Sequence, residues 1–343
     1  MSVTAASYRI RRGTRTSLVG AWLLIPLIGV LAALPFLVPA GIPDILVTLF
    51  ILVIIATMWN LLAGYAGMIS IGQQAYMGIG AYGLFAAATL WDVNPFIAVL
   101  FGVGIAAVLS IPLSFLVFRL SGGYFAIATW VVAEVVRQVV SRIPALSGAG
   151  IGTMTLPADR LGATPGWRSA SVYWLALGAV VVVVAVTYLL MRARLGAGFT
   201  AIRDEPVAAA SLGVRVTGSK RIAYVVAAAG CAVAGGILAL TTLQVRPDSM
   251  FRIDFATWMI FMVVIGGIGT IEGPIVGAVL FFVLQQWLAP LGTWYLVILG
   301  VIAILVTLLL PRGLWGLVDQ RGIRLFPVGY RVVAGAGASA STR

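Results

Sequence analysis

Charged residues are scarce in this chain of 343 residues, and several reactive residue types are nearly missing. Asp, Glu, Lys and Arg together make up 9% of the sequence, against about 25% in soluble domains. Histidine is absent and cysteine occurs once, as Cys231. A disulfide within the chain is therefore excluded, and the usual metal ligand and general base is missing. The sequence predicts no metal site and no cofactor.

Sequence signatures of nucleotide hydrolysis and other catalysis are missing too. The phosphate-binding pattern G-x-x-x-x-G-K-S/T does not occur, because the only lysine, Lys220, follows Gly-Ser and precedes Arg. There is no H-E-x-x-H, no C-x-x-C and no serine in a G-x-S-x-G context. We therefore predict that the chain is not an enzyme and has no ATPase site of its own.

Apolar residues, by contrast, make up 62% of the chain, which is more than a soluble fold of this length can bury. The formal net charge is +12, a balance that also occurs in nucleic-acid-binding proteins. Here the basic residues are dispersed at the ends of apolar runs rather than gathered on one face. They predict membrane topology and contacts with lipid headgroups, and no nucleic-acid partner.

The apolar runs predict an all-α integral membrane protein with about ten transmembrane helices, some of them broken by glycine-rich segments. A helix needs about 20 apolar residues to cross a bilayer, or fewer where it is broken inside the protein. The pair of runs from 255 to 288 gives the weakest signal, because its first run is short. The predicted spans are Leu18–Val38, Ile45–Leu62, Ile71–Leu90, Pro95–Phe118, Tyr124–Val140, Val172–Met191, Ile222–Leu243, Phe255–Ile268, Ile271–Leu288 and Trp294–Leu310.

Arginine and lysine near the span ends predict the orientation. If the spans alternate, sixteen of these residues fall on the side of the N-terminus and five on the other, while Arg137 lies within a span. Both termini are thus predicted to be cytosolic. We expect a cytosolic segment at 1–17, a transmembrane domain at 18–310 that includes a cytosolic loop at 192–221, and a cytosolic tail at 311–343. The first apolar run is too long for a cleaved signal and is expected to be retained, and Val332 to Arg343 is expected to be disordered.

The loop from Arg192 to Arg221 carries six of the 22 basic residues. Its middle predicts a short helix with Asp204 or Glu205 as the cap and Pro206 in the first turn. A run of small residues follows from Ala208 to Ala210, and Gly213 can end the helix. A short helix of this kind on the inner face predicts a surface that docks against a cytosolic partner.

Two glycine-rich turns lead into predicted spans, one within Asn60–Tyr82 and one within Val263–Leu280. Such breaks free backbone N–H groups at a helix start, which can face an anionic part of a substrate. The alternative is close packing of helices through small residues, and the sequence leaves both open. The candidates for a translocation path in the first turn are Gly64, Gly67, Ser70, Gln73 and Gln74.

Glu134 and Arg137 lie three residues apart inside a predicted span, so they share one face of a helix. Charges at membrane depth are costly and generally face a partner or a water-filled cavity. Glu134 is therefore a further candidate for the translocation path. The alternative is a mutually neutralising pair that fixes helix packing, with Arg137 reaching toward the outer surface.

Five segments, taken in order, resemble the permease subunits of branched-chain amino acid ABC importers, of the LivM type within the wider group of LivH, LivM and ribose permeases. Their order and spacing agree from about residue 60 to residue 317, which is most of the chain. The segments are NLLAGYAGMISIGQQAYMGIGAY (60–82), GGYFAIATWVVAEVVRQVV (122–140), LGAGFTAIRDEPVAAASLGV (195–214), VVIGGIGTIEGPIVGAVL (263–280) and LLLPRGLWGL (308–317).

The resemblance implies that the 192–221 loop is the coupling segment, whose short helix docks on a cytosolic ATPase. The residues implied at that contact are Arg203, Asp204, Glu205, Ala208, Ala209, Leu212 and Gly213. The implied partners are a second permease of the LivH type, two ABC ATPase subunits, a periplasmic or extracellular binding protein and membrane lipid. The implied location is the bacterial inner membrane, which the chain crosses several times. One departure is Ala197, where the family usually has arginine; Arg192 or Arg194 can compensate.

Two other classes of function stay open at this point. A stand-alone carrier driven by H⁺ or Na⁺ needs ion-binding groups at mid-membrane, and Glu134 offers one. A membrane enzyme acting on lipid needs a catalytic cluster that the sequence does not show. Within the family, leucine, isoleucine and valine are the main cargo, but relatives move urea, short amides or other amino acids. A distinct partner permease is favoured over a second copy of this chain.

Overall fold

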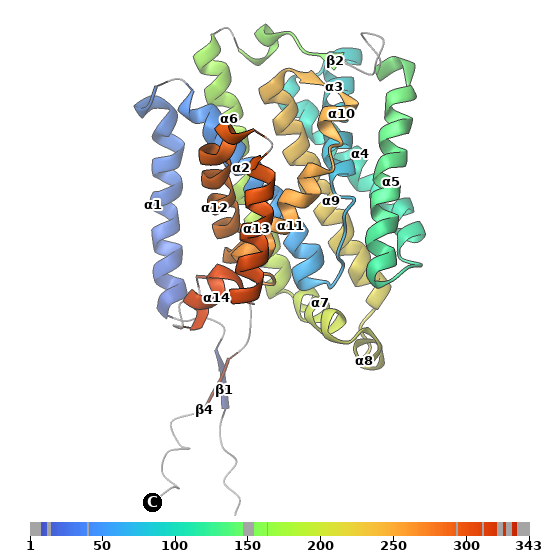
Figure 1. Ribbon diagram of the computed structural model, residues 1–343, viewed down its shortest axis with the longest axis vertical. Helices are drawn as coiled ribbons and strands as arrows, with labels where there is room; N and C mark the ends of the chain where they lie inside the picture. The colour runs from blue at the N-terminus through green and yellow to red at the C-terminus, as the bar shows by residue number, and fades with distance from the viewer. Residues whose placement is uncertain are drawn as a thin grey trace, which may run out of the picture.

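The structure is a computed structural model of the full chain, and the residues that it describes are 8–11, 15–39, 41–146, 154–162, 164–292, 294–310, 312–320, 325–326 and 331–334. Figure 1 shows a bundle of long helices that run roughly along its vertical axis. The long helices are α1 (Arg15–Leu37), α2 (Ile42–Asn60), α3 (Gln74–Leu90), α4 (Pro95–Val117), α5 (Gly122–Arg142), α6 (Pro165–Arg192), α9 (Val216–Thr242), α11 (Asp254–Gly266), α12 (Glu272–Leu288) and α13 (Trp294–Leu309).

Shorter elements join the long helices. The short helices are the π-helical η1 (Leu61–Tyr65), the 3₁₀ turns η2 (Pro144–Leu146), η3 (Ala158–Leu161) and η4 (Ala289–Leu291), and α7 (Arg194–Asp204), α8 (Pro206–Ser211), α10 (Pro247–Met250) and α14 (Gly313–Gln320). Strand β1 (Tyr8–Arg11) pairs antiparallel with β4 (Arg331–Ala334), and β2 (Met154–Thr155) pairs antiparallel with β3 (Gln244–Val245).

A helix lies within each of the ten predicted spans, so the all-α fold is confirmed. Among the described residues, seven helical segments are long and apolar enough to cross a membrane, and α12 is a shorter apolar helix. The predicted span at 255–268 was too short because α10 and α11 form one apolar segment, Pro247–Gly266. The predicted start at Ile71 is wrong, since α3 begins only at Gln74 after a non-helical stretch.

The core of the bundle is built around α2 and α9. In the most apolar stretch of the segment that contains α2, 78% is buried inside the protein, and in that of α9 the share is 67%. The corresponding stretch that covers α13 is only 12% buried. Helix α3 packs directly on α9. A Cβ at Gly80 would lie 2.2 Å from the carbonyl oxygen of Ala232, and one at Gly235 would lie 2.0 Å from that of Met77. The two backbones touch only because both positions lack a side chain.

The two ends of the bundle differ. Helices α7, α8 and α14 lie at the end drawn at the bottom of Figure 1, with β1 and β4 beyond them, and we name it the α8 end. The β2–β3 pair lies at the opposite end, the β2 end. The expectation of a disordered tail from Val332 is wrong for its first three residues, because backbone hydrogen bonds to β1 order them. Residues 335–343 lie outside the described residues.

Candidate coupling surface and translocation path

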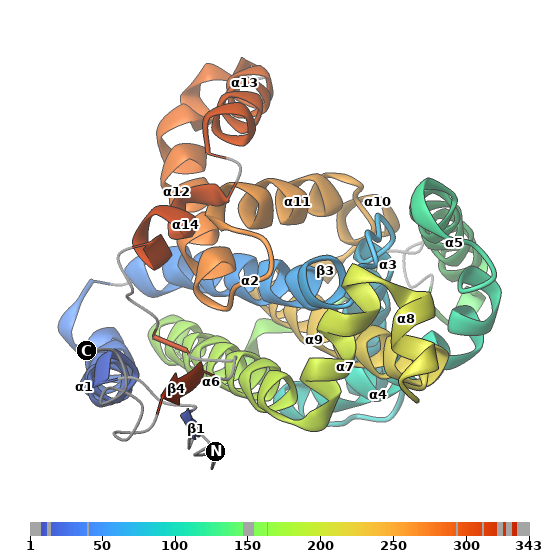
Figure 2. The same cartoon turned by 90° about the horizontal axis from the view of Figure 1, so that it is seen from below.

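Helices α7 and α8 lie across the α8 end of the bundle, below α4 and α9 (Figure 2). Helix α7 buries Phe199 and Ile202 against the bundle. The predicted short helix is confirmed as α8, with Pro206 at its first position. It ends before Gly213, whose φ of 86° favours glycine, and the N–H of Val214 donates to the carbonyl oxygen of Ala209.

The predicted cap of α8 is only partly correct. Glu205 occupies the N-cap position, but its side chain makes no capping hydrogen bond. The carboxylate of Asp204 instead forms an ion pair with Arg203, at 2.9 Å from Nη2. Pro206 has no N–H, so one group fewer at the helix start needs a cap.

The outer face of α8 is apolar and exposed. Val207 and Leu212 have 77% and 83% of their surface accessible, and Ala208 is exposed beside them. Ala209 is 1% exposed and faces the bundle. Its side chain is therefore not on the exposed face of α8, and its predicted part in the ATPase contact stays a prediction.

Arg203, in the last turn of α7, bonds both to the interior of the bundle and to a neighbouring side chain. Its Nη1 donates to the carbonyl oxygen of Gly64 in η1 at 2.9 Å, while Nε donates to Asp204 at 3.0 Å. A Cβ at Gly67, which has φ 69°, would lie 3.0 Å from the Cα of Arg203. Arg203 thus joins the α7–α8 surface to the first glycine-rich turn.

Asn60, the last residue of α2, joins the two glycine-rich turns to each other. Its Nδ2 donates to the carbonyl oxygen of Thr270 at 2.7 Å, and its Oδ1 accepts from the N–H of Gly269 at 2.8 Å. Asn60 is fully buried. A Cβ at Gly64 would lie 2.1 Å from Asn60 Oδ1 and 2.6 Å from the nitrogen of Gly269. We call the group Asn60, Gly64, Arg203, Gly269 and Thr270 the coupling junction.

The other polar candidates of the first turn lie deeper, along the stretch that leads to α3. Ser70, Gln73 and Gln74 are all buried. The hydroxyl of Ser70 accepts from the N–H of Gly72 at 3.3 Å and from Gln73 Nε2 at 3.4 Å. The Oε1 atoms of Gln73 and Gln74 have no hydrogen-bond partner among the residues that the structure describes.

The second glycine-rich turn has the geometry of close helix packing. A Cβ at Gly266 would lie 1.9 Å from the carbonyl oxygen of Gly273, and one at Gly277 would lie 1.8 Å from that of Met262. The start of α12 is occupied by Thr270, whose hydroxyl accepts from the N–H of Gly273 at 3.0 Å. Of the two interpretations of this turn, the structure therefore shows contact between α11 and α12 rather than an open helix start.

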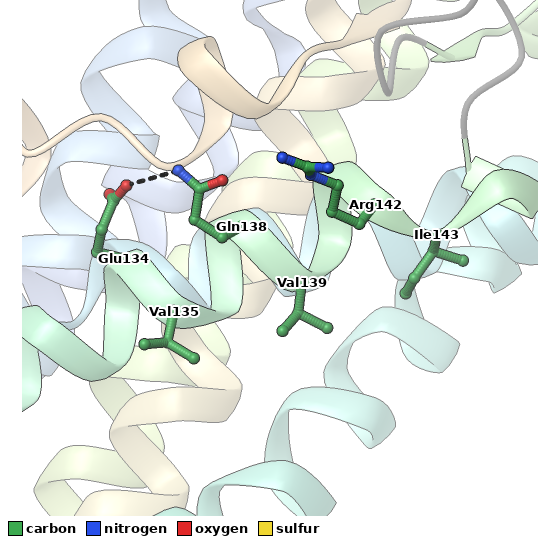
Figure 3. A pocket seen from close by; sticks show the side chains of 6 residues that line it. All are labelled: Glu134, Val135, Gln138, Val139, Arg142 and Ile143. Carbon is green, nitrogen blue, oxygen red and sulfur yellow. Dashed lines mark hydrogen bonds between the residues drawn. The ribbon is translucent and has the colours of Figure 1, made fainter.

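Glu134 and Arg137 form an ion pair on α5, and Arg137 also reaches α10. Its Nε donates to Glu134, and its Nη1 donates to Asp248 at 2.9 Å. Gln138 Nε2 donates to Glu134 at 3.2 Å. Figure 3 shows Glu134, Gln138 and Arg142 on one side of α5, with Val135 and Val139 on the other. Helix α5 therefore carries a polar stripe next to an apolar one, at the edge of the bundle (Figure 2).

The structure thus divides the predicted candidates into two places. Gly64 and Gly67 adjoin the coupling segment, whereas Gln74 and Glu134 line a common pocket with Asp248. Sequence reasoning missed Asn60, Thr270, Val207 and Asp248 as site residues. Asn60 carried a signal, since an asparagine at the end of a long apolar run needs buried hydrogen-bond partners. The other three had no local signal.

The fold is that of a multi-pass membrane protein built as a helical bundle. The chain belongs to the branched-chain amino acid permease family, since the family model described as "Branched-chain amino acid transport system / permease component" matches residues 41–307. The permease protein LivM of the high-affinity branched-chain amino acid transport system from Salmonella typhimurium is 27% identical over 319 residues, which cover 85% of this chain and 74% of the relative. The same protein from Escherichia coli matches with the same identity and coverage. No solved structure matches.

Proposed function

We propose that this chain is the permease subunit of an ABC importer that moves branched-chain or related amino acids across the bacterial inner membrane. Its membership of the permease family supports this function over a stand-alone ion-driven carrier. The LivM relatives, which carry this transport in their names, support the substrate class. Separate ATPase subunits supply the energy, so the chain itself performs no chemistry.

The α8 end faces the cytosol in this proposal, and ten helices cross the membrane. The bias of arginine and lysine toward the N-terminal side supports this orientation. Loop 192–221 and the paired strands β1 and β4 lie together at the α8 end, as an even number of crossings requires. The proposed boundaries are a cytosolic segment at 1–17, the permease domain at 18–310 and a cytosolic tail at 311–343.

The observation that carries the proposal is the hydrogen bond from Arg203 to the carbonyl oxygen of Gly64. Helix α8 offers Val207, Ala208 and Leu212 to an ATPase, with Asp204, Glu205 and Gly213 at the rim of that surface. When two ATPases close, they move α8 and with it α7. Arg203 passes this displacement to η1, and Asn60 passes it to the second turn. In this proposal the junction carries the displacement from the ATPase side to the two glycine-rich turns, where access switches from one side of the membrane to the other.

The proposed partners are a second permease of the LivH type, two ATPases, and a binding protein that delivers the amino acid at the β2 end. Ala197, where the family usually has arginine, lies exposed on α7. Arg194 lies three residues before it and shares its face. Arg192 is held by Tyr188, because its Nη1 donates to the tyrosine hydroxyl at 3.0 Å. Arg194 is therefore the residue that supplies the missing charge to the ATPase.

Replacing Ala208 by arginine tests the docking surface. The side chain is exposed, so the change leaves the fold intact but places a charged group where an apolar contact is needed. We expect ATP-dependent amino-acid uptake to fall at least about tenfold, with unchanged permease in the membrane and loss of co-purifying ATPase. Ala208→Ser, which keeps a small side chain at the same exposed position, is the control. Full uptake by Ala208→Arg, or uptake that an ionophore abolishes while ATP is maintained, would sink the proposal.

A further inference from the structure

A pocket of about 350 Å³ lies between α5, the first residue of α3 and the segment that contains α10. It is separate from the coupling junction. Glu134 and Arg137 come from α5 and Asp248 from α10, while Trp130 and Phe251 supply apolar walls. Figure 2 shows α5 and α10 at the side of the bundle, away from α1 and α6. Glu134 and Asp248 are 50% and 80% exposed, so the pocket is open to the surface of the chain rather than enclosed in its core.

In the cluster of Glu134, Arg137 and Asp248, negative charge exceeds positive charge. One guanidinium, that of Arg137, serves two carboxylates, with Nε and Nη2 on Glu134 and Nη1 on Asp248. Arg252 is the other cation that lines the pocket, and it is paired with Asp254. The three groups Glu134, Arg137 and Asp248 together retain one negative charge. Their side chains are not closed off, since Glu134 is 50% and Asp248 is 80% exposed.

The second feature of this pocket is a buried hydrogen-bond acceptor. Gln74 is 2% exposed and lines the pocket, and its Oε1 has no hydrogen-bond partner among the described residues. A buried carbonyl oxygen without a donor costs about 1–3 kcal/mol. The pocket thus combines an excess negative charge with an acceptor that lacks a donor, and both are satisfied by one group that is cationic and has several N–H bonds.

We propose that this pocket binds the α-ammonium group of the amino acid as it crosses the membrane. The N–H bonds of the ammonium are donated to Gln74 Oε1 and to the carboxylates of Glu134 and Asp248. The apolar part of the amino acid lies against Trp130, Phe251 and Ile253, which line the same pocket. This inference rests on the proposed function and adds a specific recognition site to it.

A purely structural role for the cluster explains fewer of these observations. Arg137 does tie α5 to α10, as the interpretation of Glu134 and Arg137 as a packing pair requires. One carboxylate is sufficient for that role, and Gln74 is not needed for it. The second carboxylate, the unpartnered Oε1 and the apolar walls around an open volume are all accounted for by an amino acid with an apolar side chain.

Labelling of a pocket cysteine tests the site directly in the assembled transporter. Ile253 is 45% exposed, so Ile253→Cys accepts a neutral maleimide, whereas the wild-type thiol, Cys231, is fully buried. We expect leucine and isopentylamine, which both carry an ammonium group, to slow labelling at least about threefold. The keto acid analogue of leucine, which lacks the ammonium group, should not slow labelling.

Adding Asp248→Asn to this variant should raise the concentration of leucine needed for protection about 10- to 100-fold, as for loss of one charge-assisted contact. Asp92→Asn, which removes an exposed carboxylate outside the pocket, should leave that concentration unchanged.

Equal protection by the keto acid, or no labelling because the partner permease fills the pocket, would overturn the inference. Uptake measurements distinguish a failure of the pocket from a failure of the proposed function. We expect Asp248→Asn and Gln74→Leu each to lower ATP-dependent uptake at least about tenfold while the loaded binding protein still stimulates the ATPase. Unchanged uptake in both variants refutes the pocket but leaves the importer standing. Wild-type uptake that does not depend on the ATPases refutes the importer, and the labelling assay then still decides the pocket.

Discussion

The coupling junction and the α5 pocket are both polar clusters in an apolar protein, but they are built in opposite ways. In the junction, Asn60 and Arg203 bond to backbone groups of other segments, and a single added methyl group at Gly64 has no room. In the pocket, Gln74 keeps an unpartnered oxygen and Glu134 stays half exposed beside an open volume. A closed cluster with satisfied hydrogen bonds is rigid, whereas the open pocket keeps a buried acceptor that lacks a donor; this difference is the basis of the separate roles that we propose for them.

Asn60→Leu should give the largest effect, because it removes both side-chain bonds that join the two glycine-rich turns. The carbonyl oxygen of Thr270 and the N–H of Gly269 would lose their partners, at about 1–3 kcal/mol each. We expect a clear drop in the unfolding temperature of the detergent-solubilised protein and loss of uptake. Gln74→Leu is the matched change in the pocket and should leave stability nearly unchanged or improve it. Equal stability loss in both variants would contradict the comparison.

Gly64→Ala tests the tight fit of the junction. Its Cβ would clash with Asn60 Oδ1 and with the nitrogen of Gly269, and overpacking of this kind costs about 1–3 kcal/mol. Gly104→Ala in α4 is the control, since nothing lies within 4 Å of its added Cβ. Because alanine favours helix by about 1 kcal/mol over glycine, that variant should be at least as stable as the wild type. Thermal unfolding of both variants measures the difference.

Arg203→Lys should weaken coupling more than stability. Lysine keeps the charge but lacks the planar fork that serves Gly64 and Asp204 at the same time. We expect roughly a tenfold fall in uptake per ATP hydrolysed, from the loss of one hydrogen bond to a charged donor, with the ATPases still bound. If ATP hydrolysis and uptake fall together in proportion, Arg203 contributes to assembly instead.

Arg194→Ala should have the smallest effect, because the residue is exposed and acts only at the docking surface. An exposed ion pair is worth about 0.2–1 kcal/mol, so ATPase affinity should fall by no more than about fivefold. Restoring the family residue with Ala197→Arg in the same chain should recover the affinity. Failure of that second change to compensate would show that Arg194 does not replace the missing arginine.

Much of this architecture could be predicted because its causes are local. Apolar runs give helices at each predicted span, and the sequence Glu205-Pro206 followed by small residues and Gly213 gives α8. The burial of Ala209 could not be predicted, because the six residues of α8 are too few for a periodic pattern to show which face is buried. Asp248 was missed because its partner Arg137 lies 111 residues away.

The sequence by itself determined that the chain is a helical membrane protein, where most helices begin and end, and which loop carries a short helix between two long ones. These properties follow from hydrophobicity, glycine, proline and charge within a few neighbouring residues. Only the tertiary structure decided that Arg203 holds Gly64, that Asn60 spans both glycine-rich turns, and that Gln74 meets Glu134 and Asp248 at one pocket. Arg203 and Gly64 are 139 positions apart in the sequence, and Asn60 and Thr270 are 210 positions apart. Hydrogen bonds over such separations depend on how the helices pack, and no local pattern encodes that packing.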